Sequence, residues 1–382
     1  MKHSRRSGIS PFFVMEVMKA AAERQATHGD VLHLEVGQPL TPAPRAAREA
    51  ARLAIDSDRL GYTAATGLPE LRDGIAGLYA ARYGVTVDPG RVVVTVGASG
   101  GFTLAMLACF DPGDRIGITE PGYAAYRNII EALGLELVGL PVDSGTGFNP
   151  TPAHLEAAGP LDGLVIASPS NPTGTVISVE EMAPLVGACR QRGITLISDE
   201  IYHGITFGAR EVTALSHTHD VVVVQSFSKY QSMTGWRVGW LVVPDDLVGP
   251  VERLAQNLFI SAPAVSQHAA LASLGASAEL DLNVARYRAN RDLLLTGLRD
   301  MGLDRLAPAD GAFYVWADVG DITTDSQELC RTWLDEIGVA ATPGIDFDPV
   351  DGHRFVRFSY AESTQDITAA ILRLTGWMRR RE

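Results

Sequence analysis

Short apolar runs, separated by turn residues and by helix-length amphipathic segments, make up most of the sequence. Five of these runs are continuously apolar rather than alternating, at residues 91–96, 114–119, 162–168, 193–198 and 220–226. Continuous apolar runs are typical of strands that are buried on both faces, as in a parallel sheet covered by helices. Their alternation with helical segments predicts an α/β architecture.

Two further patterns modify this architecture. The segment GWRVGWLVVP (235–244) follows the strand at 220–226 too closely for a crossover helix, so we expect it to pair antiparallel. After about residue 280 the pattern changes to a long charged helix at 283–302 and shorter strands within 311–319 and 353–360. We therefore predict a mixed, mostly parallel sheet sandwiched by helices, with a smaller α+β domain.

The length and the charge of the chain limit the number of domains and the kinds of partner. A chain of 382 residues with 46% hydrophobic content can form two domains, which we expect at 45–282 and at 1–44 plus 283–382. The net charge of -13 argues against a surface for nucleic acid or anionic membrane. With neither a signal peptide nor an apolar run of about 18 residues, we expect a cytoplasmic protein that does not span a membrane.

The cysteines and histidines do not suggest a metal site. Cys109, Cys189 and Cys330 are widely spaced in apolar surroundings, which indicates buried thiols in a reducing compartment. His217 and His219 are too close together for the usual zinc-ligand spacing. We expect no metal and no disulfide.

Polar residues follow several of the predicted strands. A glycine-rich turn at 97–101 follows the first strand and begins a helix, while Asn171, Asp199 and Lys229 follow three others. Ligands in open α/β sheets bind at the carboxyl ends of the strands, so these groups are expected to converge. Each also has an ordinary structural interpretation: a tight turn, a turn asparagine or a capping aspartate.

Lys229 is notable because the chain uses lysine rarely. It has only three lysines, two of them near the N-terminus (Lys2 and Lys19), and takes arginine for almost every other positive charge. Arginine stays protonated in proteins, whereas a lysine can lose its proton and become a nucleophilic amine. The choice of lysine at 229 therefore indicates chemistry rather than charge alone.

Together these residues resemble the fold-type I family of pyridoxal-phosphate enzymes, and within it the class I/II aminotransferases. The resemblance extends over nearly the whole chain and depends on motifs in the family's order: LEVGQP, YTAATGLPELR, PGYAAYRN, SPSNPTG, SDEIY and SFSKYQSMTGWRVGW. It implies an aminotransferase that uses pyridoxal 5'-phosphate to move an amino group from an L-amino acid to a 2-oxo acid by a ping-pong mechanism.

The resemblance assigns roles to particular residues. Lys229 corresponds to the lysine that forms the Schiff base with the cofactor and shuttles a proton. Ser226 and Arg237 correspond to phosphate ligands, and the N–H groups of the turn Gly97, Ala98 and Ser99 would complete that cradle.

Four more residues would contact the cofactor ring. Asp199 would hold the pyridine nitrogen protonated, because a neighbouring negative charge favours the charged form. Asn171 and Tyr202 would hydrogen-bond the phenolic oxygen, and Tyr123 would stack on the ring.

The remaining assignments concern the substrate and the partner subunit. Arg357 would bind the α-carboxylate of the substrate, with the backbone at Gly37 nearby. Tyr62 corresponds to a tyrosine that reaches the phosphate of the neighbouring subunit's cofactor, which implies a homodimer with shared active sites.

The sequence leaves other functions open. Carbon–sulfur lyases and cyclopropane-forming synthases of the same fold share the cofactor residues, and a non-catalytic regulator could keep the fold. A dinucleotide oxidoreductase lacks its glycine fingerprint here and leaves Lys229 unexplained. The segment 257–267 has no arginine for a second carboxylate, and Phe12, Phe13, Phe102 and Phe259 are possible pocket walls. We expect a neutral, apolar or aromatic donor, with Arg127 left unexplained.

Overall fold

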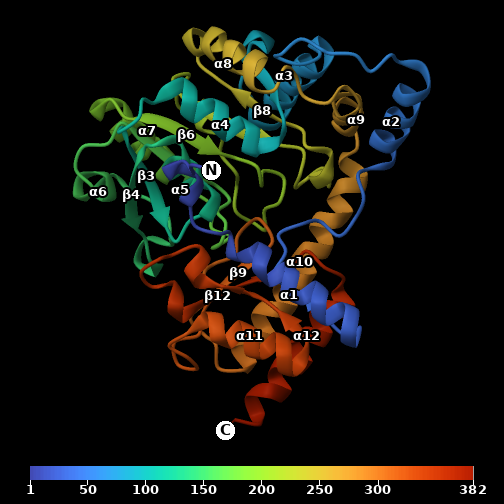
Figure 1. The fold of residues 1–382 in the computed structure, drawn as a ribbon, viewed down its shortest axis with the longest axis vertical. Helices are drawn as coiled ribbons and strands as arrows, with labels where there is room; N and C mark the ends of the chain where they lie inside the picture. Colours follow the sequence, from blue (N-terminus) through green and yellow to red (C-terminus); the bar gives the residue numbers. More distant parts are fainter. Residues whose placement is uncertain (382) are drawn as a thin grey trace.

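The computed structural model describes residues 1–381 and contains a seven-stranded sheet covered by helices, above a smaller part with two short sheets (Figure 1). The order of the large sheet is β2-β8-β7-β6-β5-β3-β4. Its strands are β2 (Val92–Thr95), β3 (Arg115–Glu120), β4 (Glu136–Pro141), β5 (Gly163–Ala167), β6 (Thr195–Asp199), β7 (Val222–Ser226) and β8 (Gly239–Val242). Only β8 is antiparallel to its neighbours, so the predicted mixed sheet is confirmed.

Both faces of this sheet are buried, which explains its continuous apolar runs. Along β2, Val92 and Val94 pack into the core on one face, whereas Val93 packs into the core on the other. The helices over the first face are α2 (Arg45–Ser57), α3 (Pro69–Tyr83), α6 (Pro152–Ala157), α7 (Val179–Arg192) and α9 (Ala264–Ser273). Those over the second are α4 (Gly97–Cys109), α5 (Ala124–Leu133) and α8 (Asp245–Leu258).

The smaller part contains segments from both ends of the chain. β1 (Leu32–His33) pairs parallel with β10 (Val339–Ala340), while β11 (Thr342–Pro343), β12 (Phe355–Ser359) and β9 (Tyr314–Asp318) form an antiparallel sheet. Its helices are α1 (Phe13–His28), α10 (Ser277–Asp300), α11 (Ser326–Ile337) and α12 (Thr364–Arg379). Figure 1 shows α1 crossing between the two parts and α10 running from one to the other. On these positions we propose the division expected from the sequence, 45–282 against 1–44 plus 283–382.

Some elements differ from the sequence expectation. The long helix begins at Ser277, before the expected start at 283, and β4 and the two-residue strands were not predicted. Within residues 1–381, no helix is long and apolar enough to cross a membrane. Cys189 and Cys330 are buried as expected, whereas Cys109 is only half-buried, and all three are free thiols.

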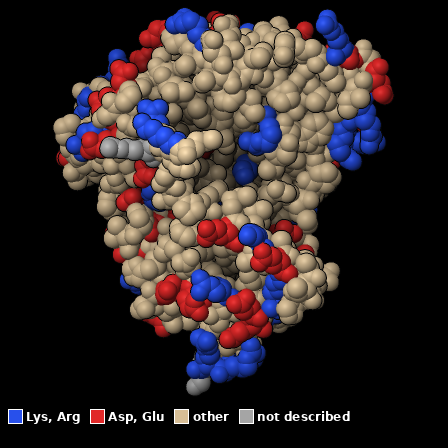
Figure 2. All heavy atoms as spheres, in the orientation of Figure 1, with Lys and Arg blue, Asp and Glu red and all other residues tan. Residues whose placement is uncertain are grey.

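The surface is hollowed between the two parts. Figure 2 shows this hollow near the middle of one face, with basic side chains visible in its depth. Most of the other charged side chains on this face lie around its outer margins and on the smaller part.

Candidate active site

A cavity of about 280 Å³ lies at the carboxyl ends of β5 and β6, beside the N-terminal half of α1. We call it the lysine cavity. Seven of the residues expected in the site line it: Gly37, Tyr123, Asn171, Asp199, Tyr202, Lys229 and Arg357. The fold thus brings together residues from both ends of the chain and from the loops after three neighbouring strands of the sheet.

Lys229 follows β7, and its amine lies inside the lysine cavity. Its Nζ donates a hydrogen bond to the carbonyl oxygen of Gly37 at 2.7 Å and lies 5.6 Å from the centre of the Tyr202 ring. Burial and, to a smaller extent, the nearby Arg357 guanidinium together lower the pKa of the Lys229 amine to about 8, against the opposing effect of Asp199. The amine is therefore much easier to deprotonate than an exposed lysine.

Asp199 ends β6 and is almost completely buried. The hydroxyl of Tyr126 donates to Asp199 Oδ2, and the backbone N–H of Ile201 donates to Oδ1 at 3.1 Å. Burial raises the pKa of the Asp199 carboxyl to about 6, although these two hydrogen bonds lower it. Asp199 thus stays ionised at neutral pH in a site that favours a positively charged neighbour.

Arg357, on β12, is 2% exposed, yet forms no ion pair within residues 1–381. Its guanidinium donates to Asn171 Oδ1 at 3.0 Å, to Thr342 Oγ1 at 3.2 Å and to the carbonyl oxygen of Glu35. The group also lies over the ring of Tyr314, 4.4 Å from its centre. A buried cation held by neutral groups is suited to an anionic ligand.

Tyr202 and Tyr314 share a hydrogen bond between their hydroxyls, 2.8 Å apart. A Cβ on Gly37 would come within 1.9 Å of the Tyr314 hydroxyl, so this position admits only glycine in the present geometry. The close approach also places the Gly37 carbonyl within reach of Lys229.

The glycine-rich turn forms the N-terminus of α4. Residues 97–99 are its first turn, and the preceding Val96 offers no side-chain cap, so first-turn N–H groups lack the usual capping acceptor. Gly97 has φ +65°, and a Cβ there would come within 2.5 Å of Arg237 Nη2. The Arg237 guanidinium therefore lies against this helix end, and the two supply a set of hydrogen-bond donors suited to an anion.

Two serines lie behind that helix end. Ser226 pairs in register with Gly239, at which a Cβ would come within 3.1 Å of the Ala98 nitrogen. The Ser226 hydroxyl donates to Ser228 Oγ at 2.8 Å. Ser228 was not expected from the sequence, although it lies beside Lys229 in the same motif.

The lining of the lysine cavity does not include Tyr62 or Arg127, nor the expected phosphate ligands Gly97, Ala98, Ser99, Ser226 and Arg237. The Tyr62 side chain is 85% exposed and does not approach the cavity of its own chain. Arg127 is mostly buried between Glu120, 3.8 Å away, and the carbonyl oxygen of Phe347. Arg127 thus joins α5 to the smaller part and does not line the cavity.

The expected phenylalanine walls need correction. Of the four, only Phe12 lines the lysine cavity. Phe102 packs in the core against Tyr126, with ring centres 4.9 Å apart, and Phe259 packs against the outer side of the same core. Phe13 lines a separate hollow beside α11. The apolar wall is instead formed from α1, by Val14, Met15 and Met18.

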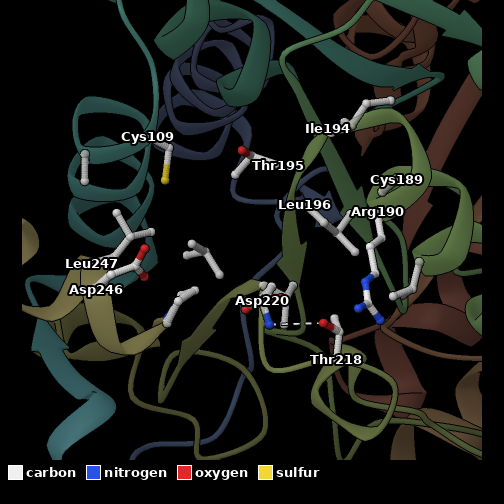
Figure 3. A pocket seen from close by; sticks show the side chains of 16 residues that line it. Cys109, Cys189, Arg190, Ile194, Thr195, Leu196, Thr218, Asp220, Asp246 and Leu247 are labelled. Carbon is white, nitrogen blue, oxygen red and sulfur yellow. Dashed lines mark hydrogen bonds between the residues drawn. The ribbon is translucent and has the colours of Figure 1, made fainter.

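A second, larger cavity of about 430 Å³ lies at the amino ends of β6 and β7, and we call it the amino-edge cavity (Figure 3). Its floor is apolar, and Arg190 and Asp246 lie on opposite sides of it. The N–H of Asp220 bonds to Thr218 Oγ1 at 3.0 Å on its rim. None of the expected site residues lines this cavity.

Comparison with known proteins identifies the family. The profile of the family described as aminotransferase class I and II matches residues 29–374. The chain belongs to the class I and II aminotransferases. A valine–pyruvate aminotransferase of Mycobacterium tuberculosis is 52% identical to it over 378 residues, which are 98% of this chain and 97% of the relative.

Solved structures agree with this assignment. A crystal structure of an aminotransferase from Mycobacterium tuberculosis has a TM-score of 0.98 and 50% identity over all of both chains. Aspartate aminotransferase from Thermus thermophilus with maleate has a TM-score of 0.93 and 30% identity over 98% of this chain and 99% of that one. The predicted fold and family are confirmed.

The protein is therefore a transaminase, which transfers an amino group between an amino acid and a 2-oxo acid. Class I and II aminotransferases generally depend on pyridoxal phosphate. The sequence did not predict Tyr126 and Tyr314, which form hydrogen bonds with Asp199 and Tyr202 respectively. The motif PGYAAYRN offers a signal for Tyr126, because Tyr126 lies one helical turn after Tyr123 on α5.

Proposed function

We propose that this transaminase binds pyridoxal 5'-phosphate in the lysine cavity and acts on neutral amino acids. The observation that carries the proposal is the presence of two desolvated cations, Lys229 and Arg357, opposite a buried carboxylate, Asp199, in one cavity. When bound, the cofactor supplies an aldehyde that accepts the amino group and a ring that withdraws electrons from the substrate's α-carbon.

The phosphate would bind at the N-terminus of α4. The N–H groups of Ala98 and Ser99, the Arg237 guanidinium and the Ser226 hydroxyl are all donors, and the first turn of α4 has no acidic residue. A helix N-terminus with an adjacent arginine favours a doubly charged anion. The chemistry of this donor set therefore fits a phosphate.

The ring would lie between Tyr123 and the strand ends. Asp199 would pair with the pyridine nitrogen and keep it protonated, and its burial would strengthen that pairing. Asn171 and the Tyr202 hydroxyl would donate to the phenolic oxygen, and Tyr314 would orient Tyr202 through their shared hydrogen bond. Tyr126 would hold the Asp199 carboxylate in place.

Lys229 would carry the proton that moves during transfer. Its lowered pKa makes the neutral amine accessible near neutral pH, so Nζ would accept the proton from the substrate's α-carbon and pass it to the carbon that the cofactor's aldehyde supplies. The Gly37 carbonyl would orient the amine through the 2.7 Å hydrogen bond. The apolar side chains of α1 would limit the access of water.

Arg357 would bind the substrate carboxylate, and the rest of the cavity supports a neutral side chain. Lys229 and Arg357 are the only Lys or Arg residues in its lining, so no third cation is available for a second carboxylate. Val14, Met15 and Met18 offer an apolar wall instead. Together with the similarity to a valine–pyruvate aminotransferase, this supports an aliphatic donor such as valine and a small neutral 2-oxo acid such as pyruvate.

We also propose that the enzyme is a homodimer with shared active sites. The exposed Tyr62 and the exposed apolar side chains of Leu53 and Ile55 suit a contact with a second copy, in which Tyr62 of each chain would reach the partner's phosphate. The cytoplasmic location expected from the sequence stays a prediction.

The test is a visible absorbance spectrum of the cofactor-loaded protein, recorded before and after addition of single amino acids from a full panel. Valine and similar aliphatic donors should convert the cofactor to its amine form, and pyruvate should reverse the change. Faster conversion by aspartate or glutamate than by every neutral amino acid would overturn the substrate proposal. Accumulation of ammonia and a 2-oxo acid without an acceptor would indicate a lyase.

A further inference from the structure

One short segment holds both cations of the lysine cavity. The carbonyl oxygen of Glu35 accepts a hydrogen bond from Arg357 Nη2, and two residues later the carbonyl oxygen of Gly37 accepts from Lys229 Nζ. The hydroxyl of Thr342 donates to the same Glu35 oxygen at 3.1 Å. The backbone at 35–37 therefore sets the position of Arg357 and Lys229 relative to each other.

The side chain of Glu35 is a buried carboxyl group of which only one oxygen is paired within residues 1–381. It is 1% exposed, and one carboxylate oxygen lies 2.8 Å from Nδ1 of His33, while the other has no hydrogen-bond partner within residues 1–381. A buried carboxylate is costly unless it is paired. The Glu35 side chain is paired with the partly exposed imidazole of His33. The burial of the Glu35 carboxylate therefore depends on this pair.

The surroundings of His33 favour its charged form. The hydrogen bond with Glu35 raises the pKa of His33, the charges of Glu362 and Asp366 add to this effect, and desolvation opposes it. Arg286 acts on Glu362 rather than on His33 directly. Three carboxyl groups thus face one imidazole at the junction of β1 with the start of α12.

We infer that Glu35 is a positioning residue for Arg357, and that the His33–Glu35 pair makes the binding of the substrate carboxylate depend on pH. This inference depends on the proposed role of Arg357. Protonated His33 neutralises the buried Glu35 and keeps the 35–37 backbone in place. Loss of that proton leaves the buried Glu35 carboxylate without a cation, so the segment 35–37 moves or takes up water. The backbone carbonyl of Glu35 then no longer holds the Arg357 guanidinium in position.

The sign follows from the direction of the His33 shift. The raised pKa means that the pair is intact at low pH and is lost as pH rises through the titration of His33. Carboxylate affinity should therefore fall as pH rises. No covalent step is involved, so the effect belongs to binding.

The experiment titrates the cofactor-loaded protein with 3-methylbutanoate, which is valine without its amino group, by calorimetry between about pH 6 and pH 8.5. Replacing His33 with glutamine (His33→Gln) should weaken binding at the low end of this pH range by about threefold to tenfold, which is the size of one ordinary net hydrogen-bond contribution. It should also reduce the dependence on pH. Glu35→Gln, which removes the buried charge, should reduce that dependence as well.

Controls separate this inference from the proposed function. His28→Gln changes an exposed histidine at the end of α1 and should keep the wild-type profile. Arg357→Gln should abolish binding at every pH, and failure to do so overturns both the role of Arg357 and this inference. If Arg357→Gln abolishes binding while His33→Gln keeps the wild-type affinity and profile, only this inference is overturned. A lower unfolding temperature in Glu35→Gln with an unchanged binding profile also overturns it.

Discussion

The two edges of the large sheet each have a cavity, and the smaller one has the features of an active site. The amino-edge cavity, at about 430 Å³, exceeds the lysine cavity at about 280 Å³. The charged groups of the amino-edge cavity, among them Arg190 and Asp220, are exposed on its rim above an apolar floor. In the lysine cavity Asp199 and Arg357 are almost fully buried, and Lys229 is partly buried.

The difference teaches that desolvated charge, rather than volume, distinguishes the two sites. Exposed charges keep their hydration and interact weakly, whereas charges removed from water shift their pKa and bind opposite charges strongly. The pKa of Lys229 is lowered and that of Asp199 is raised, both chiefly by burial.

Topology explains why these groups meet at one edge. β5, β6 and β7 are parallel, so the loops that carry Asn171, Asp199 and Lys229 leave the same edge of the sheet. β8 is antiparallel to β7, so its start, just after Arg237, returns to this edge. The single antiparallel strand thus adds a cation to the carboxyl edge and none to the opposite one.

The largest expected effect comes from replacing one cation in each cavity in turn. Lys229→Ala should lower kcat by about 10⁴-fold or more, because it removes both the proposed attachment point of the cofactor and the proposed base. Arg190→Ala, the matched change on the amino-edge rim, should leave kcat near wild type. Steady-state kinetics of valine with pyruvate give kcat for both variants. Similar losses of kcat in the two variants would contradict the assignment of the active site to the lysine cavity alone.

Replacing one carboxylate in each cavity should give a second, smaller difference in kcat. Asp199→Asn should lower kcat by about 100-fold or more, since the pyridine nitrogen loses the charge that keeps it protonated. The cofactor should still bind, through the phosphate contacts. Asp220→Asn, on the amino-edge rim, should change neither kcat nor the cofactor spectrum. Single-turnover absorbance measures the first effect, and an unchanged rate in Asp199→Asn would remove this residue from the mechanism.

The sequence predicted the polar residues that follow the strands better than the residues that form the cavity wall. Asp199, Asn171 and Lys229 lie directly after continuous apolar runs, so the parallel topology fixes their edge of the sheet. Phe102 was misplaced because a helix turns each side chain by about 100° per residue, and its face depends on packing. Tyr126 and Tyr314 act through partners 73 and 112 residues away, which no local pattern encodes. β4 was missed because only one of its six residues, Leu140, is buried and the others are half-buried or exposed.

Glu200 tests whether burial of an ionisable side chain alone is enough to mark the site. It follows Asp199 directly, is fully buried and does not line the lysine cavity. Its Oε1 accepts from the hydroxyls of Ser198 and Thr213, and burial raises the pKa of the Glu200 carboxyl to about 8. The comparison of the two edges therefore predicts that Glu200 affects stability and its pH dependence, but not turnover.

The direction of that effect follows from proton binding. Between its ordinary pKa of 4.5 and about 8, Glu200 stays protonated in the folded chain but ionises in the unfolded chain, so it makes stability fall as pH rises. Glu200→Gln removes this titration, so its stability relative to wild type should rise by about 3 kcal/mol between about pH 5 and pH 8. Urea unfolding at several pH values measures the difference. Glu180→Gln, an exposed change at the start of α7, should give no such trend. A stability difference that stays constant with pH, or a large loss of kcat in Glu200→Gln, would contradict the distinction between a buried structural carboxyl and the charged groups that line the lysine cavity.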